Sequence, residues 1–236
     1  MSMNKRVPAV SVVMPVYNAL PYLDESIRSI LNQTFEDFEF IILDDASTDG
    51  STERLREWAK ADARIRLYET REGFGPTHIF NFIVERASAP LIARMDADDI
   101  SHPERLSQQL EVLKRHPDVA LVGTLYDGID VEGRRVRQRD RWRLMRKTAF
   151  PPFPHGSVMF RREIYEAVGG YREACDAWED QDFFLRIRMR ARVVVLTDPL
   201  YSYRFHAENV TTNRSMERVT RSFCVRQRCL EELRRG

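Results

Sequence analysis

The segment Leu91-Ile-Ala-Arg-Met-Asp-Ala-Asp-Asp-Ile100 joins an apolar run to three closely spaced carboxylates, Asp96, Asp98 and Asp99. The apolar residues predict a buried parallel strand, with the acids at its carboxyl end. Because side chains alternate along a strand, we expect Asp96 and Asp98 to start on the same side. Like charges this close repel one another, and burying them without compensation costs free energy.

The segment alone leaves two interpretations of these acids open. Aspartate oxygens suit a hard ion such as Mn²⁺ or Mg²⁺, and so few of them leave coordination positions for water and for the phosphate oxygens of a ligand. Alternatively, the acids form a loop that caps a helix beginning near Pro103. The rest of the chain has to decide between a metal-diphosphate site and a cap.

Apolar strands and amphipathic helices alternate on the amino-terminal side of this segment. We expect strands at 9–16, 38–43 and 65–68, and helices that start at Pro21, just before Leu55 and at Pro76. Such alternation predicts a parallel sheet with helices on both faces. Ligands collect at the carboxyl edge of such sheets, and a second acidic turn at 44–49 falls on that edge. Two acidic clusters at one edge favour a ligand site.

The second half is less regular. A helix at 103–116, a strand at Val119–Leu125 and a hairpin around Glu132-Gly133 continue the pattern, and a helix follows Trp178. The end of the chain reads as a basic amphipathic helix. We expect one domain over residues 1–236, with a first half at about 8–100, a second half at about 101–206 and a carboxyl-terminal helix at 207–236.

Composition limits the class of protein. The 236 residues carry a formal net charge of +1, which argues against a surface built for nucleic acid. Three cysteines (Cys175, Cys224 and Cys229) lack metal-ligand spacing, which fits a reducing, cytoplasmic setting. The longest uncharged run, at 7–23, is broken by prolines and is not a transmembrane helix. The expected protein is cytoplasmic, or peripheral at the inner face of the cell membrane.

Other candidate site residues each have a plain structural alternative. Asp44 and Asp45 end a strand and can accept from a base or ribose, but aspartates are also common turn residues. Asp180, after Glu179, suits a general base or a helix cap. His155 and His206 suit ligands or ordinary structural positions. Gly73-Phe-Gly75 is a weak dinucleotide signal because the third glycine is missing.

The basic run 134–147 suits an anionic lipid, a nucleic acid or a charged acceptor, although most charge runs are solvated faces.

Five motifs in this order resemble those of family 2 glycosyltransferases with the GT-A fold. The motifs are Ser11-Val-Val-Met-Pro-Val-Tyr-Asn18, Asp44-Asp-Ala-Ser-Thr-Asp-Gly-Ser51, Arg94-Met-Asp-Ala-Asp-Asp99, His155-Gly156 and Glu179-Asp180. The resemblance covers about residues 9–206. It implies an α/β fold in three layers, a mostly parallel sheet flanked by helices with a Rossmann-like nucleotide half and an acceptor half.

The same resemblance implies the chemistry. It predicts an inverting transferase that takes a nucleotide-diphosphate sugar, usually UDP-linked, with Mn²⁺ or Mg²⁺, and acts on a glycan or lipid-linked acceptor in surface polysaccharide synthesis. Carried over by position, nucleotide-sugar contacts fall to Pro15, Tyr17, Asp44, Asp45 and Asp96. Metal contacts fall to Asp98 and His206, and the base is Asp180.

This chain departs from the family pattern before the third helix, where Arg71-Glu-Gly-Phe-Gly75 replaces the common Asn-x-Gly-Leu. Two other classes stay open beside the transferase. One is a non-catalytic binder of nucleotide sugars or glycans with the same fold. The other is a membrane or nucleic-acid module that uses residues 134–147 and the carboxyl-terminal helix.

Overall fold

The computed structural model describes residues 6–136, 153–176, 178–207, 227 and 230–231. Within this part of the chain, the strands are β1 (Val10–Val16), β2 (Phe38–Asp44), β3 (Ile65–Glu69), β4 (Leu91–Arg94), β5 (Ile100–Ser101), β6 (Val119–Ile129), β7 (Arg135–Val136), β8 (Met159–Arg161) and β9 (Arg192–Arg204). The α-helices are α1 (Leu20–Leu31), α2 (Ser51–Ala61), α3 (Pro76–Glu85), α4 (Arg105–Arg115), α6 (Arg162–Val168) and α7 (Glu179–Arg188). Two short 3-10 helices are η1 (His155–Ser157) and η2 (Glu173–Cys175).

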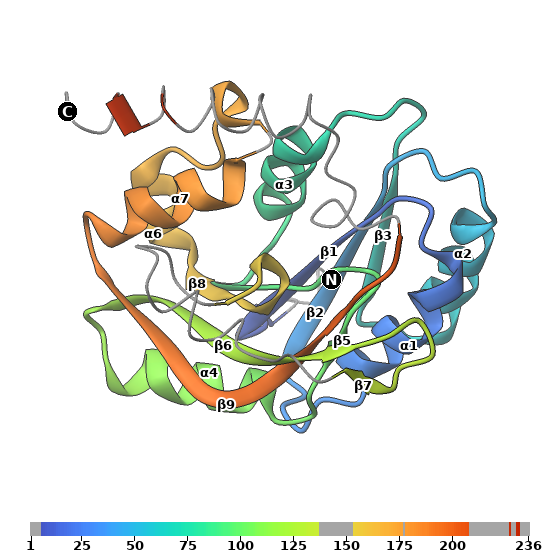
Figure 1. The fold of residues 1–236 in the computed structure, drawn as a ribbon, viewed down its shortest axis with the longest axis horizontal. Helices are drawn as coiled ribbons and strands as arrows, with labels where there is room; N and C mark the ends of the chain where they lie inside the picture. The colour runs from blue at the N-terminus through green and yellow to red at the C-terminus, as the bar shows by residue number, and fades with distance from the viewer. Residues whose placement is uncertain (1–5, 137–152, 177, 208–226, 228–229, 232–236) are drawn as a thin grey trace, which may run out of the picture.

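The described strands form one sheet in the order β3-β2-β1-β4-β8-β6-β9-β5, with β7 paired to β6 (Figure 1). Strands β3, β2, β1 and β4 are parallel neighbours. Strand β8 is antiparallel to both β4 and β6, while β9 runs parallel to β6. The expected α/β class is confirmed, and the mixed pairing is confined to the second half.

Helices cover both faces of this sheet, which gives three layers. On one face, α1, α2 and α4 pack against alternate β1 residues such as Val12 and Met14. On the other face, α3, α6 and α7 pack against Val13, Ile41 and Ile92. Because successive side chains on a strand point to opposite faces, strands covered on both faces need the continuous apolar sequence seen in β1 and β2.

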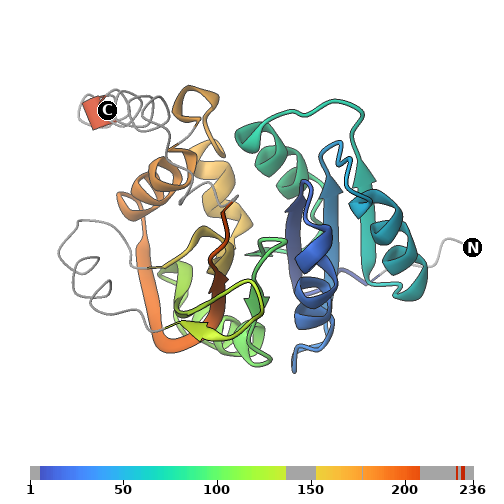
Figure 2. The same ribbon diagram turned by 45° about the vertical axis from the view of Figure 1, so that its right-hand side comes forward.

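Sheet register brings the acidic turns to one edge. Val16 at the end of β1 is level with Asp44 at the end of β2, and Val13 is level with Arg94 at the end of β4. The three strands therefore finish close together, and the segments that follow them face the same side. Figure 2 shows the blue-to-teal half on one side and the green-to-orange half on the other, with β4 between β1 and β8 in the sheet.

The structure corrects two details of the sequence expectation and adds a third. Strand β4 ends at Arg94, so Asp96 and Asp98 lie in a turn and strand alternation does not place them. Strand β6 continues to Ile129, beyond the expected Leu125. Strand β9 is a single long element whose pairing with β6 shifts register, because irregular positions let a strand bend without ending. The hairpin expected around Glu132-Gly133 is confirmed by the pairing of β6 with β7.

The expectation of reduced cysteines is contradicted by Cys175, which is buried and disulfide-bonded. Its neighbours in the core include Trp178 and, from near the carboxyl end of the chain, Leu230. Sequence spacing could not reveal this pairing because the tertiary fold decides which thiols meet. Cys224, Cys229 and nearly all of the basic run 134–147 lie outside the described residues.

The expected carboxyl-terminal helix at 207–236 also lies almost wholly outside them, apart from helical residues 227, 230 and 231. None of the helices within the described ranges has the length and apolar character needed to cross a membrane.

Two leucines on α1 give a matched test of the core between this helix and the sheet. Leu23 is completely buried, whereas Leu20 is 40% exposed. We expect Leu23→Ala to lower the free energy of unfolding by about 2–5 kcal/mol, because it removes apolar contacts and leaves a cavity. Leu20→Ala should cost about 1 kcal/mol or less. Urea unfolding followed by circular dichroism measures both, and equal losses would contradict the packing described here.

Candidate active site

The loops after β1 and β2 are bonded to each other. Asn18 adopts a positive φ of 48°, its backbone N–H donates to Ser47 Oγ, and its side-chain oxygen accepts from the Thr48 N–H. Asp49 accepts from the Leu20 N–H at the start of α1. These contacts fix the two loops as one rigid wall of the site.

Asp44 and Asp45 lie within this wall and are both buried. Asp44 Oδ2 accepts from the Thr52 hydroxyl, whereas Oδ1 has no hydrogen-bond partner in the described part of the chain. Asp45 Oδ1 accepts from the Thr70 hydroxyl and the Phe74 N–H, which ties β2 to the loop before α3. Asp44 therefore offers an acceptor to a ligand, while Asp45 mainly holds the wall together.

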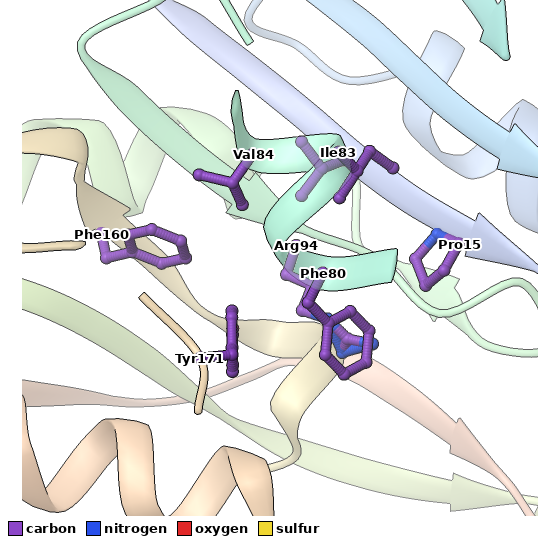
Figure 3. A pocket seen from close by; sticks show the side chains of 8 residues that line it. Pro15, Phe80, Ile83, Val84, Arg94, Phe160 and Tyr171 are labelled. Atoms are coloured by element: carbon purple, nitrogen blue, oxygen red, sulfur yellow. The ribbon is translucent and has the colours of Figure 1, made fainter. Parts of the chain in front are cut away.

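Tyr17 and Pro15 face the site in different ways. The Tyr17 side chain is 65% exposed beside the two bonded loops, so its ring is available to stack on a ligand. Pro15 is half-buried and lines an apolar pocket together with Phe80 and Arg94 (Figure 3). The Arg94 guanidinium lies 4.0 Å from the Phe80 ring centroid.

The turn that follows β4 holds its first aspartate through Arg94. Arg94 Nη2 lies 2.9 Å from Asp96 Oδ1, and the arginine is 4% exposed. Burial raises the pKa of Asp96, and the charges of Asp98 and Asp180 raise it further, while Arg94 acts in the opposite direction. Arg94 Nε and Nη1 have no hydrogen-bond partner among the described residues. The site thus contains Asp96 paired with Arg94, whose guanidinium has further N–H groups available as donors.

Asp98 lies opposite a histidine from the far end of β9. Its Oδ2 is 2.9 Å from His206 Nε2. Both side chains are partly open to solvent, at 27% for Asp98 and 12% for His206. The expected metal-binding pair therefore meets in space although its members are 108 residues apart in the sequence.

Asp99 points away from this pair into the protein. It is completely buried and accepts from the Arg204 N–H. Burial raises the pKa of Asp99 well above its usual range, and the neighbouring charges of Asp98 and Asp96 add to the effect. Its role is structural.

Gly156 allows the closest approach in the site. A Cβ at this position would overlap the Tyr201 hydroxyl and the Asp96 carboxylate. Arg105, also completely buried, donates from Nη1 to the carbonyls of Gly156 and Arg94. Only glycine fits here, because Tyr201 of β9 and Asp96 of the turn occupy the space that a Cβ would need.

Asp180 lies in the first turn of α7, across the site from the turn after β4. Its Oδ1 accepts from the Gln181 N–H and its Oδ2 from the Gln181 amide. Burial raises the pKa of Asp180, while its hydrogen bonds to Gln181 and the charge of Arg94 oppose the shift. Burial and the charge of Asp180 raise the pKa of neighbouring Glu179 to about 7. Two carboxyls with raised pKa values at a helix start exceed what a simple cap requires.

His155 occupies a structural position. Its Nε2 is 2.8 Å from the Tyr171 hydroxyl, and its ring packs edge-on against Phe80 and Phe184. Burial, together with the charge of Arg94, lowers the pKa of His155 well below its usual range. His155 is therefore a neutral member of an aromatic cluster that it forms with Tyr171, Phe80 and Phe184.

The described residues contain no group of three or more histidine, cysteine or acidic side chains arranged to hold a metal ion. Asp98 and His206 supply a hard oxygen and an imidazole nitrogen, which suit Mn²⁺ or Mg²⁺ only if a ligand completes the coordination sphere. Their partial exposure leaves room for such a ligand. The donor set therefore fits a cation that binds together with a diphosphate.

Comparison with known families decides the class of the protein. The family model for glycosyl transferase family 2 matches residues 11–169, more than half of the chain. The chain belongs to glycosyl transferase family 2. The fold and the five ordered motifs agree with this membership.

Two relatives with similar sequences are also named as glycosyltransferases. The chain is 36% identical over 186 residues to the putative glycosyltransferase EpsE of Bacillus subtilis, covering 76% of this chain and 66% of that protein. It is 31% identical over 214 residues to the O-antigen biosynthesis glycosyltransferase WbnJ of Escherichia coli, covering 87% of this chain and 82% of that protein.

A solved structure with the same fold is the mannosyltransferase PcManGT of Pyrobaculum calidifontis in complex with GDP-Man and Mn²⁺. Its TM-score is 0.71 at 25% identity, covering 87% of this chain and 59% of that one. The chain thus spans less than two thirds of several proteins that it matches.

Sequence reasoning missed the buried arginines of this family 2 site. Arg94, Arg105 and Arg204 are each less than a tenth exposed, yet none of them was assigned a role from the sequence. A signal existed for Arg94, because an arginine within an otherwise apolar strand must find a partner when it is buried. Arg105 and Arg204 lie on a helix and a strand end whose packing only the fold reveals.

The raised pKa of Glu179 gives a pH test of the site. A carboxyl whose folded pKa is about 7 and whose ordinary value is 4.5 favours folding when protonated, so its contribution to stability is lost as pH rises through this interval. We therefore expect Glu179→Gln to be more stable than wild type at pH 8, with the difference shrinking towards pH 5.

Urea unfolding at both pH values measures this, with Glu163→Gln as control. Glu163 also lies in the first turn of a helix, but its side chain is 79% exposed. If the difference in the free energy of unfolding between Glu179→Gln and wild type stays constant with pH, the raised pKa of Glu179 is contradicted.

Proposed function

We propose that this chain is an inverting glycosyltransferase that moves a sugar from a nucleotide diphosphate to a hydroxyl of a glycan or lipid-linked acceptor. One observation carries the proposal: buried Arg94 lies 2.9 Å from Asp96, and its charge also opposes the rise in the pKa of Asp180, which supports a shared site for the candidate base and the candidate donor-binding turn. Family 2 membership supports the same reaction class.

The donor nucleotide would bind at the carboxyl edge of the parallel strands. Tyr17 would offer its exposed ring, Asp44 its Oδ1, which has no partner among the described residues, and Pro15 an apolar contact. Asp45 holds the adjoining loop in place, and Asp96, held by Arg94, would accept from a ribose or sugar hydroxyl. We propose a UDP-linked sugar, as the sequence motifs imply, and GDP is the alternative because PcManGT binds GDP-Man.

Asp98 and His206 would hold a divalent cation, Mn²⁺ or Mg²⁺, against the diphosphate. A bound cation supplies positive charge that stabilises the leaving group. A glycosidase needs an acid to protonate its leaving oxygen, whereas a nucleoside diphosphate needs none. The remaining requirement is therefore a base.

Asp180 would supply that base by accepting the proton of the acceptor hydroxyl as the oxygen attacks the anomeric carbon. Attack from the face opposite the diphosphate gives a single displacement and inverts that carbon. The raised pKa of Asp180 moves it towards the range in which a carboxylate accepts protons well. The aromatic cluster of His155, Tyr171 and Phe80 would orient the substrate and exclude water.

The name of one relative supports a proposal for the acceptor class. WbnJ is named for O-antigen biosynthesis, and we propose a role in assembling a surface polysaccharide. Such a chain would work in the cytoplasm or in peripheral contact with the inner face of the membrane, where a lipid-linked acceptor is presented.

Calorimetric titration with UDP and GDP tests the donor site. We expect UDP binding that requires Mn²⁺, is lost with EDTA, and weakens about 10-fold or more in Asp98→Asn, because losing a residue that holds a metal or supports its ligands typically costs about 10–100-fold in metal affinity. Asp118→Asn is the control, since its side chain is 59% exposed and pairs with Arg192. Tight UDP binding that persists in EDTA would overturn the metal assignment. A preference for GDP over UDP would change only the proposed donor.

Asp180→Asn tests the base. We expect the rate of sugar transfer to fall by about 10²–10⁴-fold, with UDP affinity within about twofold of wild type, because a general base acts on the acceptor. The anomeric configuration of the product, read by NMR, should be inverted relative to the donor. Transfer at the wild-type rate, or retention of configuration, contradicts the mechanism. Donor binding without turnover in the wild type, across a broad acceptor panel, would favour a non-catalytic binder.

A further inference from the structure

Arg204 lies at the end of β9 and is 1% exposed. Its guanidinium contacts groups from three parts of the chain. Nε donates to the Asp98 carbonyl at 2.8 Å, Nη1 donates to the Asp130 carbonyl at 3.1 Å, and Nη2 pairs with Glu25 on α1. All three guanidinium nitrogens are therefore bonded.

The backbone of Arg204 adds a further contact to the same turn. Its N–H donates to Asp99 Oδ1 at 2.8 Å, so one residue binds both the carbonyl of Asp98 and the carboxylate of Asp99. Two contacts on adjacent residues define the path of the backbone through Asp98. A fixed backbone at Asp98 limits the directions in which its carboxylate can point.

The same residue also sets the position of His206. His206 follows Arg204 by two residues, and its imidazole reaches Asp98 Oδ2 at 2.9 Å. Tyr22 on α1 packs against both side chains, with its ring centroid 4.8 Å from the Arg204 guanidinium carbon and 5.1 Å from the His206 ring. The arginine and the histidine thus share one support on α1.

We propose that Arg204 is a positioning residue for the metal pair: it fixes the turn that carries Asp98 and the strand end that carries His206, so that both face one cation. The inference rests on the proposed function, which assigns those two residues to the metal. Lysine cannot replace it, because a single ammonium lacks the planar fork that reaches three acceptors at once.

The test measures Mn²⁺ binding directly. Free Mn²⁺ is followed by electron paramagnetic resonance while the ion is titrated into full-length protein with saturating UDP. In Arg204→Lys we expect Mn²⁺ affinity to fall about 10–100-fold, the range typical of losses in the support around a metal. Excess Mn²⁺ should restore UDP affinity to within about twofold of wild type, a rescue that a merely destabilised protein would not show.

Two further variants complete the design. Glu25→Gln leaves the arginine in place but removes its charged partner, and Glu25 is 54% exposed. We expect Glu25→Gln to weaken Mn²⁺ binding by a few-fold. This variant tests the proposal even if Arg204→Lys does not fold. Arg161→Lys is the matched control, because Arg161 also donates to backbone carbonyls, those of Val119 and Leu113, at the opposite end of β4.

The outcomes separate the two proposals. Wild-type Mn²⁺ affinity in both Arg204→Lys and Glu25→Gln overturns the positioning role and leaves the proposed function intact. An equal loss in Arg161→Lys also overturns it, because the effect would then be a general one of buried arginines. A wild-type protein that binds no Mn²⁺ with UDP overturns the metal assignment, and the positioning role fails with it.

Discussion

Carboxylates that lie close together in a protein interior repel one another and lose hydration, and nearby cations and N–H donors have to offset both costs. The turn Asp96–Asp99 meets this constraint with buried arginines. Arg94 pairs with Asp96, and Arg204 binds the backbone of Asp98 and the carboxylate of Asp99. Arg105 stabilises the carbonyls beside them. The turn stays in place because Arg94 from its own strand and Arg204 from β9 both bind it.

This constraint explains why the two halves of the sheet depend on each other. Strand β4 belongs to the parallel half, yet the partners of its terminal turn come from α4 and β9 in the second half. Gly156, in η1, is pressed so close to the turn that it admits no side chain. The second half of the chain therefore supports the candidate site residues in this turn, and the aromatic cluster around His155 packs beside them.

Much of the fold and part of the site were predictable from local pattern. Apolar runs bounded by helix starts gave β1, β2 and the acidic edge, because a strand buried on both faces must be apolar throughout. The second half was harder, since β9 bends through register shifts and β8 has only three residues. Short or bent strands leave little periodicity to read. His155 was ambiguous because a histidine looks the same in sequence whether it binds a ligand or packs in a core.

The sequence by itself determined the order of the motifs, the class of fold and the residues that could carry chemistry, because these depend on residue types and their spacing. Only the tertiary structure brought His206 to Asp98 and placed Asp180 within electrostatic reach of Asp96. It also paired Cys175 in a disulfide, against the expectation from cysteine spacing. The physical reason is the same in each case. Contacts between residues far apart in the chain depend on how the sheet and helices pack, and local pattern carries no record of that packing.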